Sequence, residues 1–340
     1  MKIIRRLGAA ALAAAMLFSV AAASASADEE KKLKKVTLML DYTPNTNHTG
    51  FYVALEKGYY EEAGLDVEII EPGDNATTTM VAAGKADFGV SYQEDVTYAL
   101  TAEEPLPIKT IAAIIQHNTS GFVSLADAGI ESPKDFEGKV YAGWGAPSEE
   151  AVIDAVMKAD GADISNLTIV GADGSGFASL SADADSGKVN IQWEFYGWAV
   201  MKGLMDGYDL SYMACSDLDE RLDYYTPLII TNNDLIESDP DTITAFISAT
   251  KKGYEYAIEN ADESAEILHD TALPDTDLEF LKASQEYLSE QYALDAECWG
   301  IMKDEVWDNY TDFMYEYELI DHTIEASEQY TNEFIEAANQ

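Results

Sequence analysis

The amino-acid sequence predicts an α/β protein of two lobes with a ligand cleft between them. In the first part of the chain, short apolar segments typical of strands alternate with helical segments of about ten residues, which indicates βαβ units and a mostly parallel sheet. In the last part, five long helical patterns follow one another and must cover a sheet or each other. The length of 340 residues suits two domains.

The first set of elements begins with an apolar segment at residues 35–41, which we predict to be a strand. A turn-rich stretch at 42–47 separates this strand from a helical pattern at 51–57. The set continues with predicted strands at 65–70, 86–91 and 108–115 and a predicted helix at 75–83.

A second set follows, with predicted strands at 121–125, 139–144, 167–171 and 189–195 and predicted helices at 147–160, 177–184 and 198–206. Beyond the segment YYTPLIIT, the pattern changes to helices at 239–259, 261–271, 277–292, 303–317 and 327–337. The economical arrangement assigns residues 36–120 and 226–340 to a first lobe, closed by the C-terminal helices, and residues 121–225 to a second. In such a fold the carboxyl ends of the strands face one another across a cleft.

Residues 1–27 are expected to lie outside this fold. They combine a basic start, an apolar stretch at 7–23 and small residues ending in Ala25-Ser26-Ala27, which is the pattern of a cleaved secretory signal peptide. The alternative is a retained membrane anchor, for which the apolar stretch is short. Because no Cys lies near the expected cleavage site for lipid attachment, we expect an exported protein, free in the periplasm or at the extracellular cell surface.

The charge of the chain excludes one large class of partner. There are 63 Asp and Glu against 20 Lys and Arg, which gives a formal charge of −43. Nucleic acids and anionic membranes are bound through clusters of Lys and Arg, so a chain this acidic is repelled from both. A hydrophobic fraction of 47% still supplies a sizeable core, and we therefore expect a folded globular protein.

The pairing of the two cysteines, Cys215 and Cys298, stays open from the sequence. Their wide separation excludes a close pair of metal ligands but permits one disulfide in an oxidising compartment. Two unpaired buried thiols are the alternative, because a chain of this length holds together without a covalent staple.

Polar and aromatic residues follow the predicted strands at equivalent positions. Such residues also occur in loops merely because they form turns and caps, so one such loop means little. Five loops at equivalent topological positions favour a binding cleft. These segments are 41–49, 91–95 and 116–120 in the first set and 143–150 and 193–198 in the second.

The side chains in these five segments suit a neutral or cationic ligand. Carboxylates and amides without a nearby Arg or Lys cannot neutralise an anion in a desolvated site. Aromatic rings are available to stack on a flat ligand, and amides and carboxylates are available to pair with ring nitrogens and an exocyclic amine. The stacking candidates are Tyr42, Trp144, Trp193, Tyr196 and Trp198, of which Trp193 and Trp198 individually fit a core role better than a ligand contact. The pairing candidates are Gln93, Glu94, Gln116 and Glu194.

Conventional catalytic motifs are absent from the sequence. There is no GxSxG, HExxH or phosphate-binding GxxxxGK pattern, and the glycines of GADGSG lack the dinucleotide-binding order. His48 and His117 belong to a residue type that transfers protons, but we expect each to hydrogen-bond a ligand or the backbone. We therefore expect a binding protein rather than an enzyme, with no catalytic residue, no metal and no cofactor.

Five segments of the sequence resemble the substrate-binding proteins of bacterial ABC importers for thiamine-pyrimidine precursors, the ThiY-like group of the NMT1/THI5-like family: LDYTPNTNHTGFYVALEKGYYEEAGLDVEI, GKADFGVSYQEDV, IQHNTSGFVSL, SPKDFEGKVYAGWG and YYTPLIITN. The resemblance covers essentially the whole chain beyond the expected signal peptide. It implies a two-lobed periplasmic-binding-protein fold (type II) that closes on formylaminopyrimidine or hydroxymethylpyrimidine. It also implies a monomer that delivers this ligand to an ABC permease and its ATPase subunits.

The resemblance implies ligand contacts in the loops already singled out. The expected contacts are Asp41, Tyr42, Asn45, Asn47, His48, Gln93, Glu94, Gln116, Trp144, Glu194 and Tyr196.

The same family contains pyrimidine synthases that use a pyridoxal-phosphate Lys and consume an active-site His. In the aligned segment this chain has Ser91 and Asp95, and in place of the synthases' Cys-rich stretch it has YYTP at 224–227. This departure favours binding over synthesis. Two alternatives stay open: the same fold with riboflavin or another small heterocycle as its ligand, and a synthase-like enzyme.

Overall fold

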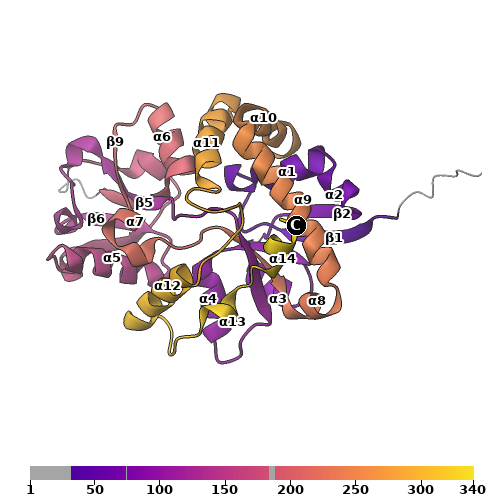
Figure 1. The fold of residues 1–340 in the computed structure, drawn as a ribbon. Helices are drawn as coiled ribbons and strands as arrows, with labels where there is room; N and C mark the ends of the chain where they lie inside the picture. The colour runs from indigo at the N-terminus through magenta and orange to yellow at the C-terminus, as the bar shows by residue number, and fades with distance from the viewer. Residues whose placement is uncertain (1–31, 74, 184–187) are drawn as a thin grey trace, which may run out of the picture. The chain divides into compact units, whose positions relative to one another are not determined.

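The computed structural model describes residues 32–73, 75–183 and 188–340. The predicted signal peptide, residues 1–27, lies outside them. Within the described ranges, no helix combines the length and the apolar composition needed to cross a bilayer. Lys34–Gln340 form one unit built around two five-stranded sheets (Figure 1).

The first sheet has the strand order β2-β1-β3-β10-β4, and we call it and the helices packed on it lobe 1. Its strands are β1 (Lys34–Met39), β2 (Leu65–Ile70), β3 (Phe88–Ser91), β4 (Ile108–Ala113) and β10 (Leu228–Asn232). Its helices before the crossing to the second sheet are a 3-10 turn η1 (Thr46–His48), α1 (Thr49–Glu56), α2 (Tyr59–Glu62), α3 (Thr77–Ala82) and α4 (Gln93–Thr101).

The second sheet has the order β7-β6-β8-β5-β9, and we call it and its helices lobe 2. Its strands are β5 (Ser120–Leu125), β6 (Val140–Gly143), β7 (Thr168–Gly171), β8 (Ile191–Phe195) and β9 (Leu210–Ala214). Its helical elements are η2 (Ala126–Ala128), η3 (Pro133–Phe136), α5 (Pro147–Ala159), η4 (Ile164–Asn166), η5 (Gly176–Ser179), a π-helix η7 (Tyr196–Val200), α6 (Met201–Met205), α7 (Cys215–Leu218) and η8 (Glu220–Leu222).

The sheets are mostly parallel, as predicted, and each contains one strand that runs against its neighbours. β10 is antiparallel to β3 and β4, and β5 is antiparallel to β8 and β9. β5 is the first strand after the chain leaves lobe 1, and β10 is the first after it returns. Each of them enters its sheet from the side where the neighbouring strands end, and it must therefore run in the opposite direction.

The C-terminal part of the chain is helical, as predicted, and begins with α8 (Asn233–Ser238) and α9 (Pro240–Glu259). Pro240 occupies the first turn of α9, and the Asp239 side chain accepts a hydrogen bond from the Thr242 N–H, which together start the helix. Its buried face then packs on the lobe 1 sheet, where the rings of Phe246 and Phe88 stack with centroids 3.8 Å apart. The remaining helices are α10 (Ala261–Ala272), α11 (Leu278–Gln291), α12 (Asp304–Glu316), α13 (Ala326–Gln329) and α14 (Glu333–Ala337).

Helix α12 contributes to the core of lobe 2 although it follows the return to lobe 1. Its residues Tyr310, Phe313 and Met314 belong to the same buried cluster as Phe122 of β5. The ring of Tyr310 stacks on that of Tyr224 with centroids 4.1 Å apart. The C-terminal helices therefore do more than close lobe 1, because α12 also packs against the segment that returns from lobe 2.

Most predicted elements are confirmed, and the differences have local causes. The prediction missed β9, whose five residues are all half-buried and show no alternation, and α4, whose apolar positions are few. The helix predicted at 177–184 is wrong over its described part, because only Gly176–Ser179 form a 3-10 turn before Leu180 adopts extended backbone. The predicted final helix is two short helices, α13 and α14, separated by extended backbone at Tyr330.

Cys215 and Cys298 are both free thiols. Cys215 begins α7 in lobe 2 and is fully buried, whereas Cys298 packs beside the lobe 1 core. Of the two alternatives left open by the sequence, the structure shows the unpaired one.

The contact between α1 and α9 depends on Gly253. A Cβ atom at this position would lie 2.0 Å from the backbone oxygen of Gly50 and 2.9 Å from the Ala54 Cβ. We expect Gly253→Val to lower the free energy of unfolding by about 3 kcal/mol, because the helices must separate to admit the side chain. Urea denaturation measures the loss. Gly171→Val in β7 is the matched control, since no atom lies within 4 Å of its Cβ position, and equal stability of the two variants would contradict the prediction.

Candidate ligand-binding site

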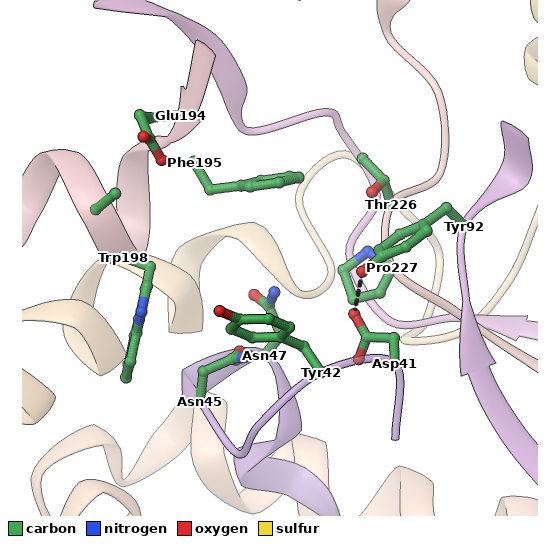
Figure 2. Close-up of a pocket in the computed structure, with 11 residues that line it drawn as sticks. Asp41, Tyr42, Asn45, Asn47, Tyr92, Glu194, Phe195, Trp198, Thr226 and Pro227 are labelled. Carbon is green, nitrogen blue, oxygen red and sulfur yellow. Dashed lines mark hydrogen bonds between the residues drawn. The ribbon is translucent and has the colours of Figure 1, made fainter. Parts of the chain in front are cut away.

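A cavity of about 310 Å³ lies between the strand ends of the two lobes. Figure 2 shows residues that follow β1 facing residues that end β8 or begin the π-helix η7. The lining residues are Asp41, Tyr42, Asn45, Asn47 and Tyr92 from lobe 1, Glu194, Phe195, Trp198 and Ala199 from lobe 2, and Thr226 and Pro227 from the segment that returns to lobe 1. This volume is at the lower end of the range for small-molecule pockets.

Asp41 is fixed from two sides. Its Oδ1 lies 2.7 Å from Nε2 of His48, and its Oδ2 accepts a hydrogen bond of 2.5 Å from the hydroxyl of Tyr92. The dashed line in Figure 2 marks the second of these bonds. Both partners come from lobe 1, so the carboxylate holds its orientation toward the cavity without help from lobe 2.

The loop after β1 fixes His48 beneath Asp41. The Asn45 side chain accepts the Asn47 N–H at 2.9 Å, and Nδ1 of His48 accepts the Asn45 N–H at 3.2 Å, which forms a capping box at the start of η1. Since Nδ1 accepts, Nε2 carries the hydrogen that is donated to Asp41. His48 is fully buried and therefore orients Asp41 from below the cavity instead of lining it.

The surroundings of Asp41 favour its ionised form. Burial alone would raise its pKa, but the electrostatic interaction with the His48 ring and the hydrogen bonds from His48 and Tyr92 lower the pKa below its ordinary value. Conversely, burial and the neighbouring Asp41 charge raise the pKa of the Tyr92 hydroxyl. The pair therefore presents a carboxylate beside a neutral phenol.

The surroundings of Glu194, across the cavity from Asp41, favour the neutral form of its carboxyl. It lies near the end of β8, and within the described residues its carboxyl has no hydrogen-bond or ion-pair partner. Burial raises its pKa to about 7. Near neutral pH the group is therefore able either to donate a hydrogen bond as an acid or to accept one as a carboxylate.

Aromatic side chains flank the two carboxyls. Tyr42 is 62% exposed although it is a large aromatic residue, and Trp198 stands edge-on at the margin of the cavity in Figure 2. Phe280 of α11 holds Trp198 in place through an edge contact with centroids 4.9 Å apart. The π-helix η7 brings both Trp198 and Ala199 to the cavity, a use typical of π-helical turns at functional sites.

The lining contains no Lys or Arg among the residues that the structure describes. With Asp41 ionised and Glu194 opposite it, the cavity repels anions and favours neutral or cationic ligands that carry hydrogen-bond donors.

Several residues predicted to contact the ligand have their polar atoms engaged elsewhere. Gln93 donates to the Val306 carbonyl and accepts the Tyr225 N–H, and Gln116 donates to the Ile301 carbonyl. These two amides are buried and tie the crossing segments to the C-terminal region. Neither lines the cavity.

Glu94 bridges the two lobes. Its Oε1 accepts a hydrogen bond of 2.7 Å from the Ser148 hydroxyl of α5, and its Oε2 accepts one of 3.0 Å from Tyr310 of α12. Burial raises its pKa, although the bond from Ser148 opposes the rise.

Two predicted aromatic contacts also lie off the cavity lining. Trp144 is 62% exposed and packs against Trp193, with centroids 5.3 Å apart. Tyr196 packs against Tyr287 of α11 at 4.9 Å and against Tyr212 of β9 at 5.1 Å.

The structure thus brings five of the predicted site residues together on the cavity lining: Asp41, Tyr42, Asn45, Asn47 and Glu194. Sequence reasoning did not select Tyr92, Phe195, Thr226 or Pro227 as contacts. Tyr92 directly follows β3, and this position at the end of a strand is a feature of the sequence from which a place at the cleft could have been predicted. Thr226 and Pro227 lie in a crossing segment whose proximity to the cleft depends on tertiary structure.

No group of three or more His, Cys, Asp or Glu in residues 32–73, 75–183 and 188–340 is placed to hold a metal ion.

The chain is similar in sequence to a family model and to two binding proteins of known ligand. Residues 45–264 match the family model described as NMT1/THI5 like. The formylaminopyrimidine-binding protein of Halalkalibacterium halodurans is 32% identical over 241 residues, which cover 69% of this chain and 70% of that protein. The riboflavin-binding protein RibY of Chloroflexus aurantiacus is 24% identical over 317 residues, which cover 89% of this chain and 86% of that protein.

Enzymes occur among the relatives as well. The 4-amino-5-hydroxymethyl-2-methylpyrimidine phosphate synthase THI11 of Saccharomyces cerevisiae is 24% identical over 238 residues, which cover 66% of this chain and 67% of that protein.

Among solved structures, the periplasmic aliphatic sulphonate binding protein SsuA from Escherichia coli matches with a TM-score of 0.65 at 12% identity, over 87% of this chain and 91% of that one. This likeness confirms the predicted periplasmic-binding-protein fold.

The raised pKa of Glu194 makes stability depend on pH. A carboxyl whose pKa rises from 4.5 when unfolded to about 7 when folded binds more protons in the folded state, so stability falls as pH rises between these values. We expect Glu194→Gln to be more stable than the wild type by on the order of 2–3 kcal/mol at pH 8 and equally stable at pH 4. Urea denaturation at both pH values measures this difference. Glu150→Gln, an exposed position on α5, is the control, and a Glu194→Gln difference independent of pH would contradict the prediction.

Proposed function

The chain belongs to the NMT1/THI5-like family, and from this premise we propose that it is the extracytoplasmic solute-binding protein of an ABC importer. Its proposed ligand is a pyrimidine precursor of thiamine, of the formylaminopyrimidine or hydroxymethylpyrimidine type. The protein captures this ligand in the cavity between the lobes and delivers it to a membrane permease with ATPase subunits. The formylaminopyrimidine-binding relative supports this ligand class.

One observation carries the proposal: two carboxyls from opposite lobes, Asp41 and Glu194, face an aromatic cavity whose described lining has no basic residue. An aminopyrimidine carries an exocyclic amine that donates hydrogen bonds and ring nitrogens that accept them. Asp41, as a carboxylate, accepts from the amine. Glu194, with a pKa of about 7, donates to a ring nitrogen when protonated or pairs with a protonated ring when ionised.

The aromatic residues fit a flat ligand. Tyr42 and Phe195 come from opposite lobes and Trp198 borders the cavity, so a planar ring has aromatic neighbours from both lobes. A stacked ring contributes on the order of 1–3 kcal/mol to binding. The same lining disfavours sulfonates, and the likeness to the sulphonate-binding protein therefore extends to the fold alone.

Closure of the lobes completes the site. Lobe 1 orients Asp41 by itself, whereas Glu194 and Trp198 belong to lobe 2, so a ligand contacts both sets only when the lobes approach one another. The ligand thereby stabilises the closed arrangement, which is the form that a permease distinguishes from the empty protein.

We further propose that residues 1–27 direct export and that the protein acts as a monomer in the periplasm or at the cell surface. The net charge of −43 leaves the protein repelled from anionic membranes, so capture by a permease depends on specific contacts with that partner.

The ligand class is tested by substitution at Asp41. We expect Asp41→Asn to weaken binding of 4-amino-5-hydroxymethyl-2-methylpyrimidine by about 10–100-fold, because a charge-assisted hydrogen bond is worth roughly 1.5–3 kcal/mol. Isothermal titration calorimetry measures the affinity. Asp127→Asn, in the exposed turn η2, is the matched control and is expected to leave the affinity unchanged.

Two results would reject the pyrimidine assignment. One is a wild-type protein whose melting temperature rises with riboflavin but not with aminopyrimidines, since a ligand that binds the folded state must stabilise it. The other is an Asp41→Asn variant with unchanged affinity for the pyrimidine.

Binding without chemistry is tested separately, because synthases occur among the relatives. The positions Ser91 and Asp95 offer no Lys or His for the synthase reaction. After prolonged incubation of the protein with pyridoxal phosphate, we expect mass spectrometry to detect no pyrimidine product. Formation of a pyrimidine would favour the enzymatic alternative.

A further inference from the structure

A second cavity of about 470 Å³ adjoins the first. Three residues line both cavities: Glu194, Trp198 and Ala199. Ala199 has only a methyl side chain, so the junction between the cavities is bordered by one bulky ring, one carboxyl and one small residue. The two cavities therefore lie next to each other, with Glu194, Trp198 and Ala199 at their common border.

The walls of the second cavity are of a kind that accepts another ring. Phe177 of η5 and Tyr208 contact each other edge to face with ring centroids 6.0 Å apart. Phe280, which contacts the Trp198 ring, also lines this cavity. The hydroxyl-bearing residues Ser175 and Thr276 also line this cavity. Aromatic walls with a few hydroxyls suit a heteroaromatic ring with a polar substituent.

The charges on these walls disfavour an anionic substituent. Lys202 is the one basic residue on the described lining of either cavity, and it is paired with Asp206 four positions along α6. Glu194 lines the same cavity as this neutral pair. A phosphate in the second cavity would compete with Asp206 for Lys202, whereas a cation beside Glu194 competes with no basic residue for that carboxyl.

Glu194 lies where the two parts of a bipartite ligand would join. Its carboxyl is largely buried, borders both cavities and has no partner within the described residues. A positive charge at the junction would supply the partner that this carboxyl lacks.

We propose that the cleft binds a two-ring ligand: an aminopyrimidine in the first cavity, joined through a one-carbon bridge to a cationic heteroaromatic ring in the second, with the cationic atom beside Glu194. This inference rests on the proposed function and widens its ligand class from single-ring precursors to compounds in which the pyrimidine already carries its second ring. Thiamine has this chemistry and serves as the probe.

The experiment compares thiamine with the single-ring 4-amino-5-hydroxymethyl-2-methylpyrimidine by isothermal titration calorimetry. We expect the wild-type protein to bind both. Tyr208→Ala, which changes only the second cavity, should weaken thiamine binding about tenfold and leave the single-ring affinity within twofold. Phe177→Leu should act in the same direction and serves if Tyr208→Ala fails to fold. Tyr315→Ala removes an exposed tyrosine from α12, away from both cavities, and is the matched control.

A second comparison tests the role of Glu194. Glu194→Gln keeps the shape of the side chain and removes its charge, so it should weaken thiamine at least fivefold more than the single-ring pyrimidine.

The outcomes separate this inference from the proposed function. A wild-type protein that binds the single-ring pyrimidine but not thiamine overturns the inference and leaves the proposed function intact. Equal losses for both ligands in Tyr208→Ala and Phe177→Leu, or unchanged affinity for both, also overturn it, because the second cavity then holds no separate part of the ligand. Failure to bind any pyrimidine overturns both proposals together.

Discussion

The direction of two strands determines where the site forms. β5 and β10 are the first strands after each crossing between the lobes, and each runs against its neighbours because it enters its sheet from the cleft side. The carboxyl ends of β1, β3 and β8 then lie at the crossing. Asp41 and Tyr92 follow β1 and β3, and Glu194 lies near the end of β8. A site between lobes follows from this arrangement, since side chains from distant parts of the sequence meet there.

The two carboxyls of the site differ because their surroundings differ. Asp41 lies above a capping box that fixes His48 and receives a second hydrogen bond from Tyr92, so its charge is compensated before any ligand arrives. Glu194 is buried without such support, and its ionisation depends on what occupies the cleft. One carboxyl is therefore preorganised and the other responds to the ligand, a division that suits a protein which must both recognise and release its cargo.

The sequence predicts the strands and the polar loops well because both are local features. Apolar segments such as that of β2 are bounded by turns, and the residues after a strand end are readable from the chain alone. Whether a side chain in such a loop faces the cavity depends on partners far along the chain. The side chain of Gln93 does not line the cavity, because it forms hydrogen bonds with the backbone of Tyr225 and Val306. Both partners are distant in the chain, so no local sequence pattern predicts them.

The hydrogen bond between Glu94 and Ser148 connects α4 of lobe 1 to α5 of lobe 2, outside the cavity lining. A substitution at Ser148 therefore changes how the two lobes are held together without changing a residue of the cavity lining. Cohesion between the lobes and recognition at the strand ends depend on separate sets of side chains.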